Sequence, residues 1–235
     1  MRIWIWNNKI YNLMNRKKNS GKAEDENIRI VEEKIHPDIF SEFFHYLEDK
    51  DALAGEVPDL KRVLIRMALD GNIESYRKIE KMINEGNLSG EMKNFAAVAL
   101  NYCRFKIENE LLDEPIDMVS GGLGGTANKM RYYLALSGKD GITMEQCEHL
   151  ERVFREVTEA RDSVLEEVKL HDFYVSLLIL GSFNHAVGDA VDAGLRECDF
   201  LQKDYYLTNV EIPTDERIRD WLDGKLDDDE FSIKT

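Results

Sequence analysis

The densest glycine cluster of the chain lies between residues 120 and 129, which read SGGLGGTANK. Its glycines leave backbone N–H groups accessible and allow positive φ, as an anion-binding nest requires, and Lys129 adds positive charge. The spacing differs from a GxxxxGK[ST] phosphate loop, because Lys129 leads into a predicted strand and not into a helix. Three interpretations stay open: a hairpin connection, a contact loop for a partner, and a site for phosphate or another anion. The residues concerned are Ser120, Gly121, Gly122, Gly124, Gly125, Thr126, Lys129 and Arg131.

A second group of polar side chains follows two predicted strands, 130–137 and 173–180. If these strands are parallel, their C-terminal ends meet at one edge of a sheet, where open α/β sheets bind ligands. Two predicted helices begin at that edge, and helix N-termini favour an anionic group and a neutral His185. The alternative is structural: helix caps, a turn residue and a solvated histidine. The residues concerned are Ser137, Lys139, Asp140, Thr143, Ser182, Asn184 and His185.

The common catalytic and metal-binding patterns are missing from the sequence. It contains no GxSxG, HExxH or HxH pattern, and its three cysteines form no CxxC pair. The acidic run 227–230 lacks the alternating ligands and the glycine of an EF-hand. We therefore predict no catalytic residue, no metal and no cofactor, and favour a non-catalytic role while leaving enzymatic activity open.

Composition and charge indicate a globular protein and argue against two classes of partner, duplex nucleic acid and anionic membrane. Hydrophobic residues make up 43% of the 235-residue chain, as in an ordinary globular protein. The 31 basic and 46 acidic residues give a formal charge of −15, which argues against nonspecific duplex binding and against adhesion to anionic membrane. No apolar run is long enough to predict a membrane span. The widely spaced cysteines fit a reducing compartment, so we expect a cytoplasmic protein.

The N-terminal half is predicted to be mostly helical. Residues 1–27 are expected to be a disordered basic leader and linker, and residues 28–113 a helical domain. Apolar spacings of three and four predict helices over 39–47, 60–68 and 73–83, and from a Ser89 cap to Leu111. Short turns between them predict antiparallel helical hairpins, either HEAT-like or a plain bundle.

The C-terminal half, residues 114–224, is predicted to alternate strands and helices, with an acidic tail at 225–235. Thr143 and Gln146 form a capping-box pattern that opens a helix expected to continue to about residue 168. Strand–helix–strand succession predicts right-handed parallel crossovers and a small α/β layer of βαβαβ, ferredoxin-like or open-sheet type. The whole chain is therefore expected to be a helix-rich α+β protein. The expected strands are 116–119, 130–137, 173–180 and 205–212, and further helices are expected at 185–199 and around 218–222.

Three functions remain compatible with the sequence. The favoured one is a cytosolic interaction or regulatory protein that docks a protein partner through its helical layer. The alternative is a protein or enzyme that binds a phosphorylated metabolite or other anion at 137–143 and 181–185. The third is a ribosome- or RNA-associated factor with tyrosines as stacking faces, which the charge of −15 disfavours. Those tyrosines are Tyr132, Tyr133, Tyr205 and Tyr206.

Overall fold

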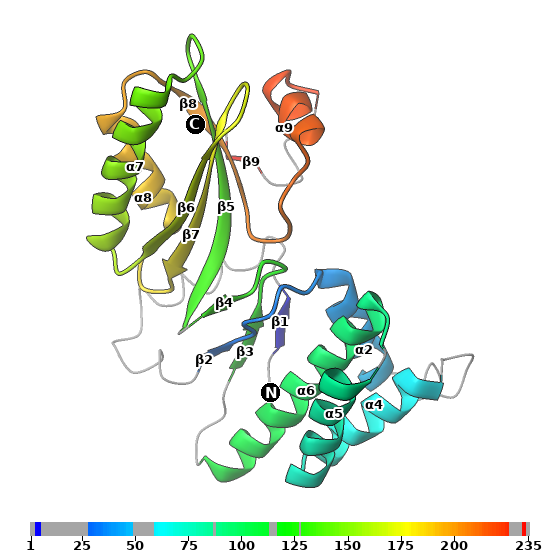
Figure 1. The fold of residues 1–235 in the computed structure, drawn as a ribbon. Coiled ribbons are helices and arrows are strands. Elements are labelled where there is room, and N and C mark those ends of the chain that lie inside the picture. The colour runs from blue at the N-terminus through cyan, green and yellow to red at the C-terminus, as the bar shows by residue number, and fades with distance from the viewer. Residues whose placement is uncertain are drawn as a thin grey trace. The chain divides into compact units, whose positions relative to one another are not determined.

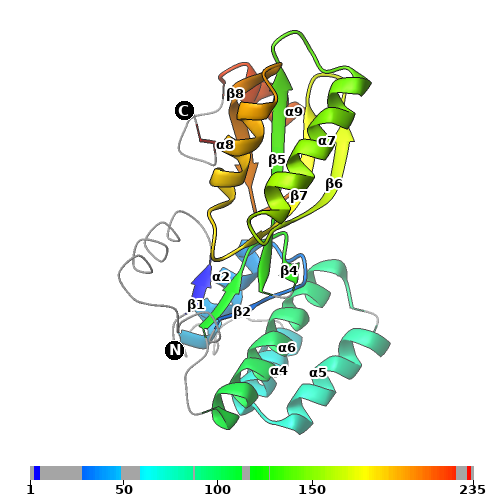
Figure 2. The ribbon, with the colours of Figure 1, turned by 90° about the vertical axis from the view of Figure 1, so that its left-hand side faces the viewer.

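The computed structural model describes residues 3–5, 28–48, 59–86, 88–112, 117–126, 128–225 and 232–233. The chain divides into two compact units, Met1–Gly122 and Leu123–Thr235, which Figures 1 and 2 draw as ribbons. Both units combine helices with strands, so the predicted helix-rich α+β class is confirmed. None of the helices in the described segments is both long and apolar enough to cross a membrane.

The N-terminal unit contains a small parallel sheet of three short strands. Strand β3 (Asp117–Ser120) lies between β1 (Ile3–Ile5) and β2 (Ile28–Ile30), so the β-like run predicted near 116–119 is a strand of this sheet. The chain from Ile28 was expected to be helical, but it first forms β2, because pairing with β3 fixes an extended backbone there. Apart from β1, the predicted leader and linker lie outside the described residues.

The predicted helices of this unit are confirmed. Two of them begin at side-chain caps, since Asn72 accepts a hydrogen bond from Ser75 N at 2.9 Å and Ser89 accepts one from Met92 N. Gly71 has φ +59°, which lets the chain reverse within two residues. Figures 1 and 2 show the last three helices side by side. The helices are α2 (Pro37–Glu48), α4 (Asp59–Asp70), α5 (Ile73–Glu85) and α6 (Gly90–Leu111).

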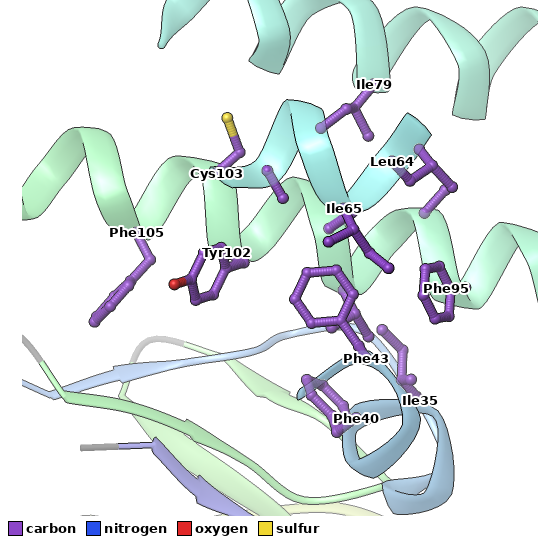
Figure 3. Packing of buried hydrophobic residues seen from close by; sticks show 14 of the residues in the cluster. Ile35, Phe40, Phe43, Leu64, Ile65, Ile79, Phe95, Tyr102, Cys103 and Phe105 are labelled. Carbon is purple, nitrogen blue, oxygen red and sulfur yellow. The ribbon is translucent and has the colours of Figure 1, made fainter. Parts of the chain in front are cut away.

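An aromatic core holds these helices together (Figure 3). The Phe43 ring of α2 lies 5.5 Å from Phe95 and 5.7 Å from Tyr102, both on α6. Phe105, which falls off the apolar stripe of α6 in the sequence, is also buried, at 3% exposure. Lys61 is the one charged residue buried here in the described chain, and its ammonium lies 2.7 Å from Glu42 and 3.1 Å from Glu91. Burial opposes the charge of Lys61, but these hydrogen bonds outweigh it and raise its pKa.

The C-terminal unit is built on an antiparallel sheet with the strand order β6-β7-β5-β8-β9, and β4 pairs with β5. Helix α7 connects β5 to β6, α8 connects β7 to β8, and α9 follows β8. The strands joined through each helix run parallel to each other, but another strand lies between them in the sheet. The strands are β4 (Gly125–Thr126), β5 (Lys129–Gly138), β6 (Val164–Leu170), β7 (Val175–Ser182), β8 (Leu201–Thr208) and β9 (Ser232–Ile233). The helices are α7 (Met144–Glu159), α8 (Val187–Glu197) and α9 (Asp215–Leu222).

The prediction of one long helix from Thr143 to about 168 is only half right. The capping box of Thr143 and Gln146 is confirmed, but α7 ends at Glu159. The N–H of Ser163 donates to the Thr158 carbonyl at 2.9 Å, and Asp162 between them has φ +50°, which is the geometry of a Schellman helix stop. The chain beyond this stop becomes β6, because it pairs with β7 along its length.

The two faces of the C-terminal sheet are covered by different helices. Figure 1 shows α7 and α8 on one side and α9 on the other. Side chains alternate along a strand, so Tyr132 and Leu134 of β5 face one side while Tyr133 and Ala135 face the other. The second side forms a core with Tyr206, Ile218 and Trp221 in which α9 supplies the cover.

Candidate functional site

The glycine-rich segment is a hairpin whose backbone is used within the fold. Gly125 pairs with Met130, and the turn between the two strands includes Asn128 at φ 63°. The N–H of Leu123 donates to the carbonyl of Asn209 at 2.9 Å, and all four glycines of the segment are buried. A hairpin is therefore present, but it joins β4 to β5, whereas the interpretation had it join 116–119 to 130–137; β3 (Asp117–Ser120) pairs with β1 and β2 instead. Contact with a partner or an anion, through the exposed Thr126 for example, stays a prediction.

The predicted ligand edge is divided between the two ends of the sheet. The expectation required parallel strands, whereas β5 and β7 are antiparallel, with Lys129 opposite Ser182. The reason is β6: the hairpin from β6 into β7 reverses the chain before β7 begins. Residues 137–143 consequently lie at one end of β5 and residues 181–185 near its other end.

At the first end, the predicted residues have local roles. Thr143 caps α7, and Lys139 donates a hydrogen bond through its ammonium to the carbonyl of Asp199. Asp140 is exposed, and the hydroxyl of Ser137 is buried without a hydrogen-bond partner. At the other end, Asn184 was expected to cap the next helix, but the residue before α8 is Ala186 and no side chain caps it.

The second end joins residues from both predicted sites. Lys129 binds Asp162 at 2.7 Å, and Arg131 binds Glu166 through two nitrogens, one of them at 2.8 Å. The hydrogen bond from Lys129 is the main cause that lowers the pKa of Asp162, and Ser182 and His185 act in the same direction. Both cations that an anion would need are thus held by carboxylates. This cluster ties β5 to the turn between α7 and β6, through Asp162, and to β6 itself, through Glu166.

A polar network that the sequence did not reveal lies on the α9 side of the sheet. The Tyr174 hydroxyl donates to Asp215 Oδ1 at 2.6 Å and accepts from the Tyr133 hydroxyl at 3.3 Å. The His171 ring stacks on Tyr174 with centroids 4.0 Å apart, and its Nε2 lies 2.8 Å from Ser176 Oγ. His171 Nδ1 lies 3.6 Å from the same Asp215 oxygen. We call these five residues the Tyr174 network.

Three separate elements position the Tyr174 network. The tight turn between β6 and β7, closed by a 2.9 Å hydrogen bond from His171 N to the Tyr174 carbonyl, brings the two rings together. Tyr133 comes from the central strand β5, and Asp215 is the first residue of α9. Thr214 caps α9 by accepting a hydrogen bond from Arg217 N at 3.2 Å, which fixes the start of the helix at Asp215.

Burial and neighbouring charges shift the pKa of Tyr174 and of His171. Burial raises the pKa of Tyr174, and the Asp215 carboxylate raises it further, so the phenol keeps its proton and donates it. Burial lowers the pKa of His171, while Asp215 acts in the opposite direction. Tyr174 is only 2% exposed and is therefore shielded as a nucleophile. The part of the chain that the structure describes contains no group of three His, Cys, Asp or Glu residues that could hold a metal.

Helix α9 is held on the sheet by the apolar residues Ile218, Trp221 and Leu222 and by contacts of its polar side chains. Ile218 and Trp221 are buried, the Trp221 ring meets Tyr206 edge-on at 5.9 Å, and the Arg219 guanidinium lies 4.9 Å from the centre of the Phe173 ring. Trp221 Nε1 is buried without a hydrogen-bond partner. An unsatisfied buried donor lowers the free energy of unfolding by about 1–3 kcal/mol. Burial of one large apolar side chain raises it by about 1.5–3 kcal/mol, so the two effects are comparable. The side-chain amide nitrogen of Asn209, directly after β8, is buried without a partner as well.

Sequence reasoning missed this network because its members come from separate segments. The helix expected to continue to about residue 168 hid β6 and the turn that holds His171, while Tyr174 fell within the strand expected at 173–180. The signal that could have found them is the polar pair at 171–172 between two β-like runs, which is typical of a hairpin turn.

Comparisons with known proteins give a limited result. No protein-family model matches the chain, and no curated protein matches it. Among solved structures, the chain is similar to a crystal structure of a protein from Deinococcus radiodurans R1 that is provisionally described as a transposase. The match has 18% identity and a TM-score of 0.36, and covers 43% of this chain and 94% of the other. At this score the similarity carries no argument about function.

Proposed function

We propose that this chain is a non-catalytic interaction or regulatory protein that docks a protein partner through one end of its helical layer. The observation that carries the proposal is a group of exposed apolar residues there, above all Ile73, 61% exposed, and Leu111, 79% exposed. Leu69 and Leu112 are also exposed. We call these four residues the apolar end of the helical layer.

The contacts between the helices support placing these residues at the same end. The turn between α4 and α5 packs on α6 at Lys106, whose ammonium donates to the Leu69 carbonyl. Gly71 in this turn is so close that a Cβ atom there would lie 2.9 Å from Lys106 Cβ. Helix α6 continues for five residues from Lys106 to Leu111, which is about 8 Å along its axis. Exposed apolar groups gathered in this way are typical of protein interaction sites.

The alternatives receive less support. The anion-binding alternative needs free cations near one sheet edge, but Lys129 and Arg131 are paired and Lys139 lies at the other end of β5. The RNA alternative needs exposed stacking faces, but all four tyrosines proposed for it are buried. A negative chain also repels nucleic acid.

We extend the proposal to the fold class of each part and to the location of the protein. The succession of α4, α5 and α6 with short turns supports a helical-hairpin or bundle class for the helical part. The strand order β6-β7-β5-β8, with α7 and α8 as connections, supports a ferredoxin-like class for the C-terminal unit. The three cysteines are free and buried, which supports a cytoplasmic location.

The experiment is an affinity capture with matched variants. Wild type and an Ile73→Glu/Leu111→Glu variant are used as bait in lysate of the source cells, and any captured protein is purified and titrated against both. We expect equimolar binding to the wild type and at least a tenfold weaker binding to the variant, because two charges would replace apolar contacts.

The control is Met144→Glu, which adds the same charge at an exposed apolar residue of the C-terminal unit. It should bind like the wild type, and all three proteins should unfold at similar urea concentrations. Equal binding by the wild type and the double variant, or no equimolar complex with any captured protein, would contradict the proposed function.

A further inference from the structure

We propose that α9 is a displaceable cover, and that the sheet face beneath it is a docking surface for an amphipathic helix of a partner protein. This surface lies within the C-terminal unit and does not depend on the apolar end of the helical layer. The proposal therefore goes beyond the proposed function and can fail separately from it.

Helix α9 itself defines the chemistry of the occupant. Asp215 accepts the Tyr174 hydrogen bond, Ile218 and Trp221 enter the core of this face with Leu222 packed against it, and Arg219 lies over the Phe173 ring. These residues stand at positions 1, 4, 5, 7 and 8 of the helix, so they form one side of it. A partner helix would need a carboxylate in its first turn, and on the same side three large apolar residues and a cation.

The receiving surface offers a matching set of groups. Tyr174 supplies a hydroxyl donor at one end, and Phe173 supplies an aromatic face for a cation. Tyr133, Ala135 and Tyr206 form the apolar floor between β5 and β8. This floor belongs to the paired central strands, so it would keep its shape when the cover leaves.

Three features make α9 replaceable. It has only eight residues, fewer than an isolated helix needs to be stable in water. Its docking leaves Trp221 Nε1 buried without a partner, and Asn209 Nδ2 is equally unsatisfied at the start of the connection to α9. A partner helix of three or more turns would make the same contacts with more helical structure of its own, and opening would let water or the partner satisfy these donors.

The test supplies the α9 sequence in trans. A fluorescein-labelled peptide of residues 211–225 is titrated with the full-length wild type and with an Ile218→Ala/Trp221→Ala variant, and binding is followed by fluorescence anisotropy. The variant keeps its floor but loses the two most buried apolar anchors of its own cover, so it should bind the peptide at least tenfold more tightly than the wild type. An Asp215→Ala variant, which keeps all apolar anchors, should bind the peptide about threefold more tightly.

Matched controls separate this result from general stickiness. A peptide with Ile218→Ser and Trp221→Ser should bind none of the proteins, and Ile73→Glu in the helical unit should leave peptide binding unchanged. Equal peptide affinity in the wild type, the double variant and Asp215→Ala, or no binding to any of them, would overturn the proposal. A wild-type dimer that exchanges α9 between its copies would also overturn it, because the occupant would then be a second copy.

Discussion

The two faces of the C-terminal sheet are closed in different ways. Under α7 and α8 the contact is apolar and very close: a Cβ at Gly194 of α8 would lie 2.5 Å from the Phe154 ring of α7, and one at Gly181 of β7 would lie 2.3 Å from Val187. Under α9 the contact combines three apolar side chains, of Ile218, Trp221 and Leu222, with the Tyr174 network and a buried indole N–H that has no partner. The first face is covered through close apolar packing. On the second face, directional polar contacts add to the apolar packing.

This difference separates a structural face from an adaptable one. Close packing tolerates little change, because atoms that meet below van der Waals distance must move their neighbours. When a covering helix is held by hydrogen bonds and leaves a donor unsatisfied, it can move away, since water or another chain can supply the missing contacts. We therefore expect mutations on the α7–α8 face to affect global stability, and mutations on the α9 face to affect mainly the position of α9.

The largest effect is expected for Phe154→Ala. Phe154 is fully buried, and its removal would leave a cavity between the two helices. The free energy of unfolding in urea should fall by about 3–5 kcal/mol. Trp221→Ala on the other face is the matched aromatic truncation, and it should cost clearly less because it also removes an unsatisfied donor. Equal losses for the two variants would contradict the distinction between the faces.

The next effect is expected for Gly194→Ala, where the added methyl group would collide with the Phe154 ring. Overpacking of this kind should lower the free energy of unfolding by about 1–3 kcal/mol. Gly188→Ala in the same helix is the control, because its Cβ would lie an ordinary 3.6 Å from the Tyr205 hydroxyl. Alanine should raise the free energy of unfolding there by up to about 1 kcal/mol through its helix propensity. The comparison fails if both alanines act in the same direction.

A smaller and local effect is expected for Asp215→Ala. The Tyr174 hydroxyl loses its acceptor, which should cost about 1–3 kcal/mol and speed hydrogen exchange in α9 more than in α7. The pKa of Tyr174 should fall, because the carboxylate that raises it is gone. Glu216→Ala removes an exposed acid from the same turn and should leave exchange and the pKa of Tyr174 unchanged. A change of the same size in Glu216→Ala would mean that helix charge, and not the Tyr174 contact, matters.

The smallest effect is a pH dependence from His171. Burial lowers the pKa of His171 in the folded state below its usual 6.5, so the unfolded chain takes up the proton more readily. The stabilisation is therefore complete above pH 6.5 and is lost as the pH falls below it. Asp215, Asp172 and Glu167 favour the charged ring and Lys169 opposes it, which keeps the net effect small.

The measurement for His171 is a difference between two proteins. Urea unfolding of the wild type and of His171→Gln is recorded from pH 5 to pH 8. The stability difference should be constant at the upper end and should change below pH 6.5 in the direction that disfavours the wild type. A difference that is independent of pH would mean that the ring environment does not favour the neutral form.

Local hydrogen bonds made much of the fold predictable from sequence. The cap at Ser89 and the capping box of Thr143 and Gln146 involve residues three apart, and both are found in the structure. The strand over 130–137 was also predicted, because its tyrosines and leucines favour extended structure wherever they pair.

Non-local pairing explains what sequence reasoning missed. Val164, Leu165 and Val168 fit a helical stripe as well as a strand, and only pairing with β7 decides between the two. Because β6 was not predicted, the direction of β7 was predicted wrongly. The residues of the predicted ligand edge therefore lie at two opposite ends of the sheet. The end of α7 was also hard to predict from the sequence, because the left-handed position after it is occupied by Asp162 and not by glycine.

Native-state hydrogen exchange of the full chain tests the difference between the two faces most directly. Amides of α7, α8 and α9 would be followed individually by NMR in the wild type without denaturant. We expect the amides of α9 to exchange through a local opening, and to be at least a hundredfold less protected than those in the buried turns of α7 and α8. Equal protection of the three helices would contradict it, because α9 would then open only when the whole unit unfolds.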